Sequence, residues 1–127
     1  MHHSRLCALV LDCKVDDLGD AVRFWSEALG KPVATTDQDG DGRYAELHTA
    51  DDEPLILLQK VEHESRVHLD IETDDLEAEA SRLERLGAKR VAFMRERWWV
   101  MEAPSGQRFC VVRRQREASG THLNRWD

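Results

Sequence analysis

The sequence predicts an α+β fold made of two copies of one βαβββ module. Each copy places an apolar segment, an Asp-Asp-Leu triplet and a Leu-Gly pair in the same order. The triplets stand at 16–18 and 74–76, and the pairs stand at 29–30 and 86–87. A period of about 58 residues is too long for a solenoid and suits an internally duplicated domain. Two half-sheets of this kind are expected to close around a shared cavity, where a functional site would lie.

The first copy begins with the apolar segment from Cys7 to Cys13, which we predict as a buried strand. Asp16 or Asp17 can cap the helix that follows, because an aspartate side chain accepts hydrogen bonds from free first-turn amides. Apolar residues at helical spacing then form one stripe, namely Leu18, Ala21, Val22, Trp25, Ala28 and Leu29. Gly30 is expected in the left-handed position after the helix, and Pro32 prevents the helix from continuing.

Three strands complete each copy. In the first copy they are expected at 32–36, 44–49 and 55–61, separated by turns at 37–42 and 50–54. In the second copy they are expected at about 90–95, 98–102 and 108–113. The chain is therefore predicted to be one domain, with module one at about 5–61, module two at about 65–113 and a polar C-terminal tail at 114–127.

The first strand of the second copy, at 66–72, alternates between apolar and polar residues. Its apolar positions are expected to face the helix, and they are Val67, Leu69 and Ile71. His68 and Asp70 would then point to the opposite face, toward the cavity. Asp74 and Glu77, three residues apart, match a capping box at the start of the helix. The apolar stripe of this helix is Leu76, Ala80, Leu83 and Leu86.

Composition limits the possible partners. The apolar fraction of 41% and the charged fraction of 34% are typical of a soluble globular domain. The net charge of −7 argues against nucleic acid, because binding it requires a basic surface. No segment approaches the length of a membrane-spanning helix, and the first residues lack the apolar run of a signal peptide. Three cysteines without metal-type spacing fit a reducing compartment, so we expect a cytoplasmic protein.

The arrangement resembles the vicinal oxygen chelate superfamily, which includes glyoxalase I, extradiol dioxygenases and bleomycin-resistance proteins, and especially its small glyoxalase-like domains. The resemblance covers residues 6 to 113 and rests on the order and spacing of short motifs. These are Leu11-Asp12-Cys13, Phe24-Trp25, Leu29-Gly30, Val67-His68-Leu69-Asp70, Asp74-Asp75-Leu76, Leu86-Gly87-Ala88 and the segment from Ala103 to Val112. The resemblance implies a glyoxalase-like fold, with two modules forming a half-open barrel around a ligand pocket, and commonly a homodimer.

The metalloenzymes of this superfamily place four ligands, typically two histidines and two glutamates, on inward-facing strand positions. The resemblance carries these positions onto Val10, Leu57 or its neighbour, His68 and Cys110. Valine and leucine have no donor atoms, whereas a stable divalent site generally needs three or four protein ligands. We therefore expect no metal at the usual centre and no other cofactor.

A different metal set remains open. If Ala45 and Leu47 pack toward a helix, Glu46 and His48 point into the cavity and could join His68 as a set of two histidines and one carboxylate. A divalent metal would then be held by residues of both modules.

Several side chains could carry chemistry. His68, helped by Asp70, could act as a general acid or base, or it could be a structural histidine. Cys110 could be a nucleophile, although a small buried hydrophobic role is the commoner one for such a residue. Trp98 and Trp99 point to opposite faces of their strand, so one of them would reach the pocket. We expect one cavity lined by Val10, Leu57, His68, Cys110 and one of the two tryptophans, with Asp70, Glu46 and His48 nearby.

Three functions follow from these residues. The first is binding of a small, partly apolar or aromatic molecule in the cavity without the usual metal. The second is a lyase or isomerase in which His68 moves a proton. The third is a divalent-metal-dependent enzyme of the glyoxalase or dioxygenase type. The substrate itself cannot be deduced, because this fold serves many chemistries.

Overall fold

The computed structural model describes residues 1–35, 42–116 and 122–127. The elements follow in the order β1 (His2–Cys13), α1 (Leu18–Leu29), β2 (Val33–Thr35), β3 (Tyr44–Leu47), β4 (Leu55–Lys60), β5 (Arg66–Thr73), α2 (Leu76–Arg85), β6 (Lys89–Met94), β7 (Trp98–Glu102), β8 (Arg108–Arg113) and β9 (Asn124–Trp126). The expected turn at 37–42 lies outside the described residues except for Gly42. Within these described residues, no helix is long and apolar enough to cross a membrane.

The chain forms two compact units. One unit is Ala8–Val67, and the other, which we call the His68 unit, combines Met1–Cys7 with His68–Asp127. Strand β1 therefore contributes its first residues to the His68 unit and its last residues to the Ala8–Val67 unit. Each unit contains one helix and an α+β arrangement of strands, so the predicted fold class is confirmed.

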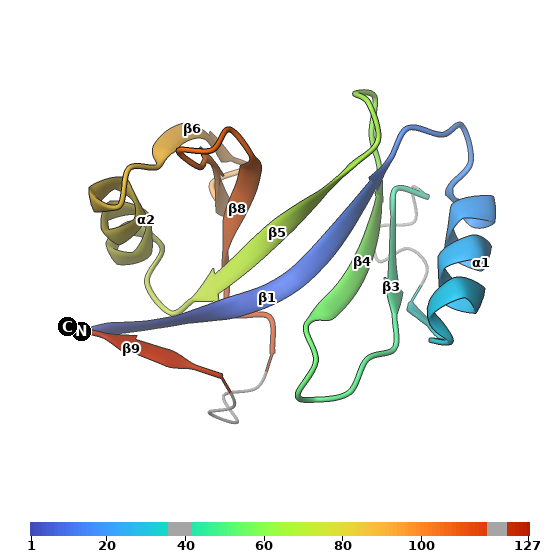
Figure 1. Cartoon of the computed structure of the whole chain (residues 1–127), viewed down its shortest axis with the longest axis horizontal. Helices are drawn as coiled ribbons and strands as arrows, with labels where there is room; N and C mark the ends of the chain where they lie inside the picture. The colour runs from blue at the N-terminus through green and yellow to red at the C-terminus, as the bar shows by residue number, and fades with distance from the viewer. Residues whose placement is uncertain (36–41, 117–121) are drawn as a thin grey trace. The chain divides into compact units, whose positions relative to one another are not determined.

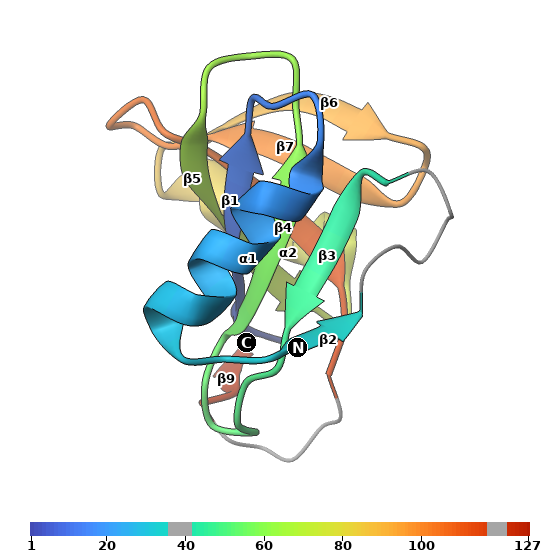
Figure 2. The same ribbon diagram turned by 90° about the vertical axis from the view of Figure 1, so that its right-hand side faces the viewer.

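In the Ala8–Val67 unit, the hydrogen-bonded strand order is β2-β3-β4-β1. Strands β1 and β4 are parallel, with Val10 opposite Leu57, whereas β2–β3 and β3–β4 are antiparallel. Helix α1 packs on β3 and β4 (Figure 2). The core beneath it consists of Cys13, Leu18, Val22, Ala45, Leu47 and Leu58. The parallel pair joins the first and last strands of the module, as expected for βαβββ rather than for successive βαβ crossovers.

The ends of α1 follow the sequence signals. Asp17 is the N-cap, and its carboxylate accepts a hydrogen bond of 2.8 Å from the amide of Gly19. Gly30 adopts φ 66°, a left-handed conformation that costs glycine little, and its amide bonds back to the carbonyls of Ser26 and Glu27. The helix therefore begins and ends at the predicted residues.

The His68 unit repeats the module order. Strands β5, β8, β7 and β6 are hydrogen-bonded in this order, with β5 and β8 parallel and the other pairs antiparallel. Helix α2 packs on β6, β7 and β8 (Figure 1). The core beneath it is Ala80, Leu83, Met101 and Val111, with Ile71, Leu76, Ala88, Trp99 and Phe109 packed around it. The predicted duplication of βαβββ order is thus confirmed.

The predicted capping box of α2 is wrong by one residue. Asp75, not Asp74, is the N-cap and accepts a hydrogen bond of 3.0 Å from Ala78. Asp74 instead accepts hydrogen bonds from the backbone amide of His3 and from its ring Nδ1, each at 2.8 Å. Glu77 binds Arg90 rather than the cap residue. Both carboxylates of the predicted capping box, Asp74 and Glu77, therefore bind residues distant in sequence. A local sequence pattern does not predict such contacts.

The prediction that the apolar face of β5 packs against the helix holds only at one end of the strand. Ile71 joins the α2 core, but Val67 is 59% exposed and Leu69 is 44% exposed. The reason is the position of α2, which packs on β6, β7 and β8 rather than along β5. Period-two alternation correctly separates the two faces of the strand but does not say how far a helix covers one of them.

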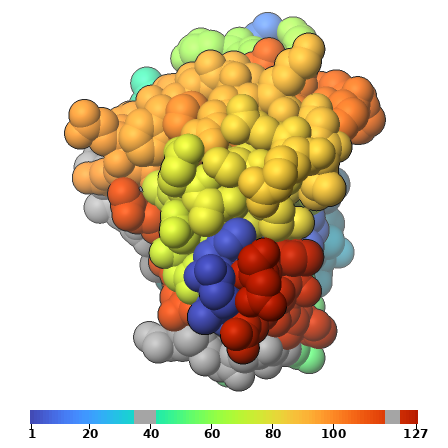
Figure 3. All heavy atoms as spheres, turned by 90° about the vertical axis from the view of Figure 1, so that its left-hand side faces the viewer, coloured from blue at the N-terminus to red at the C-terminus, as the bar shows by residue number. Residues whose placement is uncertain are grey.

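The polar C-terminal segment contains a strand. Strand β9 pairs antiparallel with the start of β1, with Trp126 opposite His2 and Asn124 opposite Ser4. Figure 3 shows the first residues (blue) and the last residues (red) side by side. The indole of Trp126 donates a hydrogen bond of 2.8 Å to Ser4 Oγ, and the guanidinium of Arg82 lies 3.8 Å from its ring centre. The tryptophan therefore docks on the unit, which explains its presence in a polar segment.

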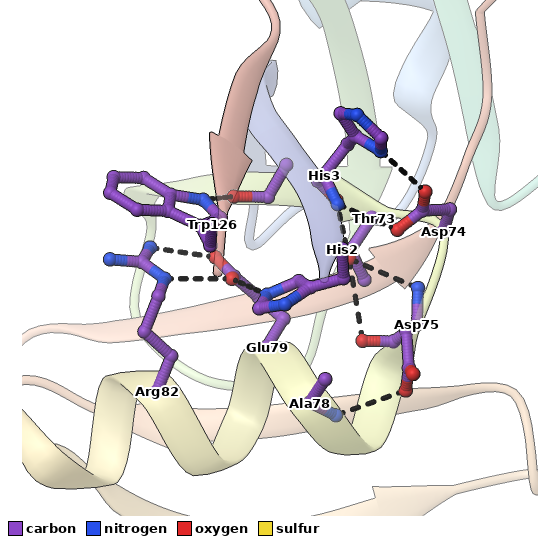
Figure 4. A network of polar contacts seen from close by, with 10 residues as sticks. His2, His3, Thr73, Asp74, Asp75, Ala78, Glu79, Arg82 and Trp126 are labelled. Carbon is purple, nitrogen blue, oxygen red and sulfur yellow. Dashed lines mark hydrogen bonds and ion pairs between the residues drawn. The ribbon is translucent and has the colours of Figure 1, made fainter.

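A buried carboxylate connects α2 with the start of β1 (Figure 4). Glu79 is fully buried, and Arg82 donates two hydrogen bonds to it, of 2.9 and 2.8 Å. His2 Nε2 lies 2.8 Å from the same carboxylate. Burial alone would raise the pKa of Glu79, but the hydrogen bonds from Arg82 and His2 outweigh it and hold the pKa below its usual value.

A second buried carboxylate joins three distant segments of the His68 unit. Glu72 on β5 accepts hydrogen bonds of 3.0 Å from the Nε atoms of Arg5 on β1 and Arg116 beyond β8. The backbone amides of Gln115 and Arg116 also donate to it, at 2.8 and 3.1 Å. Burial would raise the pKa of Glu72, but these hydrogen bonds lower it further than burial raises it. We call Arg5, Glu72 and Arg116 the Glu72 cluster.

Cys7 lies close to this cluster and is almost completely buried. Burial and the negative charges of Glu72 and Asp70 raise the pKa of its thiol to about 12. The thiol is therefore protonated at neutral pH, so Cys7 is a packing residue rather than a nucleophile.

We expect Glu72→Gln to lower the free energy of unfolding by about 3 kcal/mol at pH 7, because it leaves two guanidinium groups without their buried counter-charge. Urea unfolding followed by circular dichroism measures the change. The folded pKa of Glu72 lies below its unfolded value, so its ionised form stabilises the fold above the unfolded pKa of about 4.3. That stabilisation is lost as the pH falls through the folded pKa, so the variant and the parent should converge in strong acid.

Glu62→Gln is the matched control, since Glu62 is exposed, and its effect should stay within about 0.5 kcal/mol. Equal stability of Glu72→Gln and Glu62→Gln at pH 7 would contradict the stabilising role of the cluster.

Candidate functional site

The face of the His68 unit opposite α2 gathers most of the predicted chemical residues. Cys110 lies directly opposite Asp70 on β5 and Val100 on β7. Side chains at directly opposed positions share a face, and residues two apart on a strand do as well. His68 and Trp98 therefore belong to the same face. We call this set of five residues the His68 face.

The same register decides which tryptophan lies on this face. Trp99 is opposite Val111 and packs with the core beneath α2. Its ring also contacts Phe93, with ring centres 4.9 Å apart. Trp98 consequently projects from the other side of β7. The prediction that the two indoles occupy opposite faces is confirmed, and Trp98 is the one that lies with His68.

His68 and Asp70 form a close pair on β5. His68 Nε2 lies 3.3 Å from Asp70 Oδ1, and the two side chains are only 13% and 14% exposed. Asp70 Oδ1 is inaccessible to solvent and has no hydrogen-bond partner of good geometry. A carboxylate beside an imidazole orients the ring and favours its protonated form. The pair can therefore accept and return a proton, the property expected of an acid–base site.

Cys110 lies close to this pair. Its sulfur, a ring nitrogen of His68 and a carboxylate oxygen of Asp70 all lie within 4.8 Å of one another. All three side chains are partly buried, so they are shielded from bulk water yet not sealed from it. The trio offers an imidazole, a carboxylate and a thiol at one point of the sheet. The sequence predicted His68 and Cys110 in one cavity with Asp70 nearby, but not the register that joins them.

The predicted site residues of the Ala8–Val67 unit form a separate row. Leu57 on β4 lies opposite both Val10 on β1 and Glu46 on β3, so the three side chains share the face away from α1. Ala45 and Leu47 pack in the core beneath α1, as expected. His48 is exposed and lies just beyond the end of β3, which stops at Leu47 instead of Thr49. The single cavity expected to join these residues with the His68 face stays a prediction.

The usual four-ligand metal centre does not fit this chain. Two of its positions are Val10 and Leu57, which lie opposite each other and present only hydrocarbon. Among the residues that the structure describes, one group of three potential ligands is close enough to share an ion, and it consists of His68, Asp70 and Cys110. The alternative set of Glu46, His48 and His68 remains a prediction.

Three residues beside the site were not identified from sequence. Arg5, Glu72 and Arg116 form the buried cluster that begins two residues beyond Asp70 on the same strand. The sequence did contain one indication. Glu72 follows His68 and Asp70 at alternate positions of β5, so its side chain is expected on the same face of the strand. Its two arginine partners lie 67 and 44 residues away in sequence, and no local pattern predicts such pairs.

Comparison with solved structures supports the fold. The hypothetical protein BH1468 from Bacillus halodurans C-125 superimposes with a TM-score of 0.65 at 14% identity, over 91% of this chain and 98% of that one. Methylmalonyl-CoA epimerase from Mycobacterium tuberculosis gives 0.64 at 16% identity, over 91% of both chains. A glyoxalase/bleomycin resistance protein/dioxygenase superfamily member from Vibrio splendidus 12B01 gives 0.55 at 17% identity, over 87% and 99%. At these identities the likeness concerns the fold alone.

Comparison of the sequence with family models is more specific. No curated protein matches the chain. The model of the glyoxalase-like domain matches residues 8–112, a range that includes both modules and every strand of the His68 face. The structural relatives include a member of the glyoxalase/bleomycin resistance/dioxygenase superfamily, in agreement with the resemblance found in the sequence motifs. The chain therefore belongs to the glyoxalase-like domain family.

Proposed function

We propose that this protein binds a small, partly apolar or aromatic molecule on the His68 face, without the four-ligand metal centre of its metalloenzyme relatives. The observation that carries the proposal is the grouping of a half-buried imidazole–carboxylate pair with an indole on one sheet face. Small-molecule sites are mostly apolar and contain a few convergent polar groups. Trp98 and Val100 supply the apolar surface, and His68 and Asp70 supply the polar groups.

The face also supports a second function, proton transfer in an epimerase, isomerase or lyase. Asp70 holds the imidazole of His68 at 3.3 Å and stabilises the charge that the ring gains when it accepts a proton. Structural relatives named as methylmalonyl-CoA epimerases share the fold, which makes this reaction class a reasonable candidate. In such a step the C–H bond of an acidic carbon breaks, the proton moves to a ring nitrogen of His68, and the electron pair stays on the substrate as an enolate. Return of the proton regenerates the imidazole.

Binding can be measured with anilinonaphthalene sulfonate, a planar apolar probe whose fluorescence rises on transfer from water. We expect His68→Gln and Trp98→Ala each to weaken its binding by about tenfold, equivalent to about 1.4 kcal/mol. The reason is that the first removes a polar contact and the second removes the aromatic surface. Fluorescence titration of the full chain gives the dissociation constants.

The matched controls replace an exposed histidine and an exposed aromatic residue elsewhere, His63→Gln and Phe24→Ala. Both should bind the probe like the parent. Equal weakening by Phe24→Ala and Trp98→Ala would place the probe elsewhere and contradict the proposed site.

Proton transfer can be tested with methylmalonyl-CoA in deuterium oxide, with a chelator present to keep metals away. If the second function holds, the protein exchanges the proton on the substrate's central carbon, and His68→Gln slows exchange by at least about a hundredfold. Mass spectrometry of the recovered substrate measures the exchange, and His63→Gln should retain the parent rate. No exchange above background, with normal probe binding, would leave ligand binding as the function.

We also propose a cytoplasmic homodimer. No disulfide joins the three cysteines, which suits a reducing compartment. Leu69 and Phe93 are each 44% exposed on the His68 unit, and apolar side chains of this size favour burial against a partner. Sedimentation equilibrium should therefore give twice the chain mass of 14.6 kDa, and a single-chain mass at micromolar concentration would contradict the dimer.

A further inference from the structure

We propose that His68, Asp70 and Cys110 together bind a thiophilic divalent cation, with Zn²⁺ as the natural fit. Their donor atoms lie within 4.8 Å of one another, and all three are carried by the parallel strands β5 and β8. Imidazole, carboxylate and thiolate are all established zinc ligands. Three protein ligands with one open position are the arrangement of catalytic rather than structural zinc sites.

The spacing is close to what a tetrahedral ion requires. Zinc–ligand distances of about 2.0–2.3 Å place the ligand atoms of one ion roughly 3.3–3.7 Å apart. The His68–Asp70 separation of 3.3 Å already has this value. The sulfur of Cys110 lies within 4.8 Å of the other two donor atoms, so it must approach them by at most about 1.5 Å, which rotation of its side chain can supply.

Asp70 provides a second, independent reason. Its Oδ1 atom is inaccessible to solvent and receives no hydrogen bond of good geometry, although His68 Nε2 lies 3.3 Å away and buried carboxylate oxygens normally accept one. A cation at the centre of the trio would satisfy this oxygen. The cysteine proton is released to solvent when the thiolate binds, so metal binding by this site is expected to acidify an unbuffered solution.

This ligand set differs from the usual centre of the superfamily. That centre uses four positions spread over both modules, and two of them are Val10 and Leu57 in this chain. The trio needs neither residue, because Asp70 and Cys110 complete a set within one module. A set containing thiolate and imidazole selects Zn²⁺ or Co²⁺ over Mg²⁺ and Ca²⁺, which prefer oxygen ligands.

A bound cation would act as a Lewis acid on an oxygen of a ligand. It would also occupy a ring nitrogen of His68, so His68-dependent proton exchange should stop when the site is loaded. The proposal goes beyond small-molecule binding and does not depend on it, because it rests on three donor atoms alone.

Cobalt provides the direct test, since a thiolate bound to Co²⁺ gives a sulfur-to-metal charge-transfer band in the near ultraviolet. Titration of the full, tag-free chain with Co²⁺ should produce this band with a one-to-one end point, and Zn²⁺ should displace it. Cys110→Ser should abolish the band. Cys13→Ala should keep it, because Cys13 lies in the core of the other unit. Asp70→Asn should weaken Co²⁺ binding by at least about tenfold.

The His3→Gln variant removes a competing exposed histidine and should leave the titration unchanged. Circular dichroism and urea unfolding verify that each variant folds. The absence of a charge-transfer band in the parent protein would overturn the proposal, as would a band that survives Cys110→Ser. Neither result depends on the binding of anilinonaphthalene sulfonate, so failure of the metal site and failure of the small-molecule site are distinguishable.

Discussion

The Glu72 cluster is the constraint on which the His68 unit depends. A carboxylate in a nonpolar interior is costly unless other groups neutralise and hydrogen-bond it. Strand β5 carries this carboxylate, and β1 and the segment after β8 supply the groups that compensate it. The cluster fixes the end of β5 against two segments distant in sequence. Asp70 and His68 follow on the same face of the same strand, so the position of the chemical pair depends on the cluster beside it. Burial, together with the negative charges of Glu72 and Asp70, raises the pKa of the neighbouring Cys7 thiol and keeps it protonated.

The two modules share a plan but differ in chemistry. Val10 in the first copy stands where His68 stands in the second, 58 residues later. The first copy has Val10 in place of the imidazole and Gln59, opposite Asp12, in place of the thiol, whereas the second copy has His68 and has Cys110 opposite Asp70. The duplication therefore supplies two similar scaffolds, and the proposed acid–base or metal site lies on the second. The hydrocarbon side chains of Val10 and Leu57 are the reason that the usual two-module metal centre does not fit.

Much of the architecture could be predicted because its signals are local. Asp17, Gly30 and the alternating residues of β5 act within one or two turns of chain, and they gave the helix ends and strand faces correctly. The failures involve long-range partners. Asp74 binds His3 instead of capping α2, Leu69 lies beyond the reach of the helix, and β9 pairs with the first residues of the chain. For the candidate site, residue types were predictable, but the register that places Cys110 opposite Asp70 depends on tertiary pairing.

The central claim is that Glu72 remains ionised inside the folded unit, held by Arg5 and Arg116. Carbon-13 NMR of the side-chain carboxyl of Glu72, followed as the pH is lowered while the chain stays folded, measures this ionisation directly. We predict that the resonance stays at its ionised position well below the ordinary pKa of a glutamate and changes only as the protein unfolds in acid. A carboxyl that takes up its proton above the ordinary pKa while the fold is intact would show that burial outweighs the arginines, and it would contradict this account.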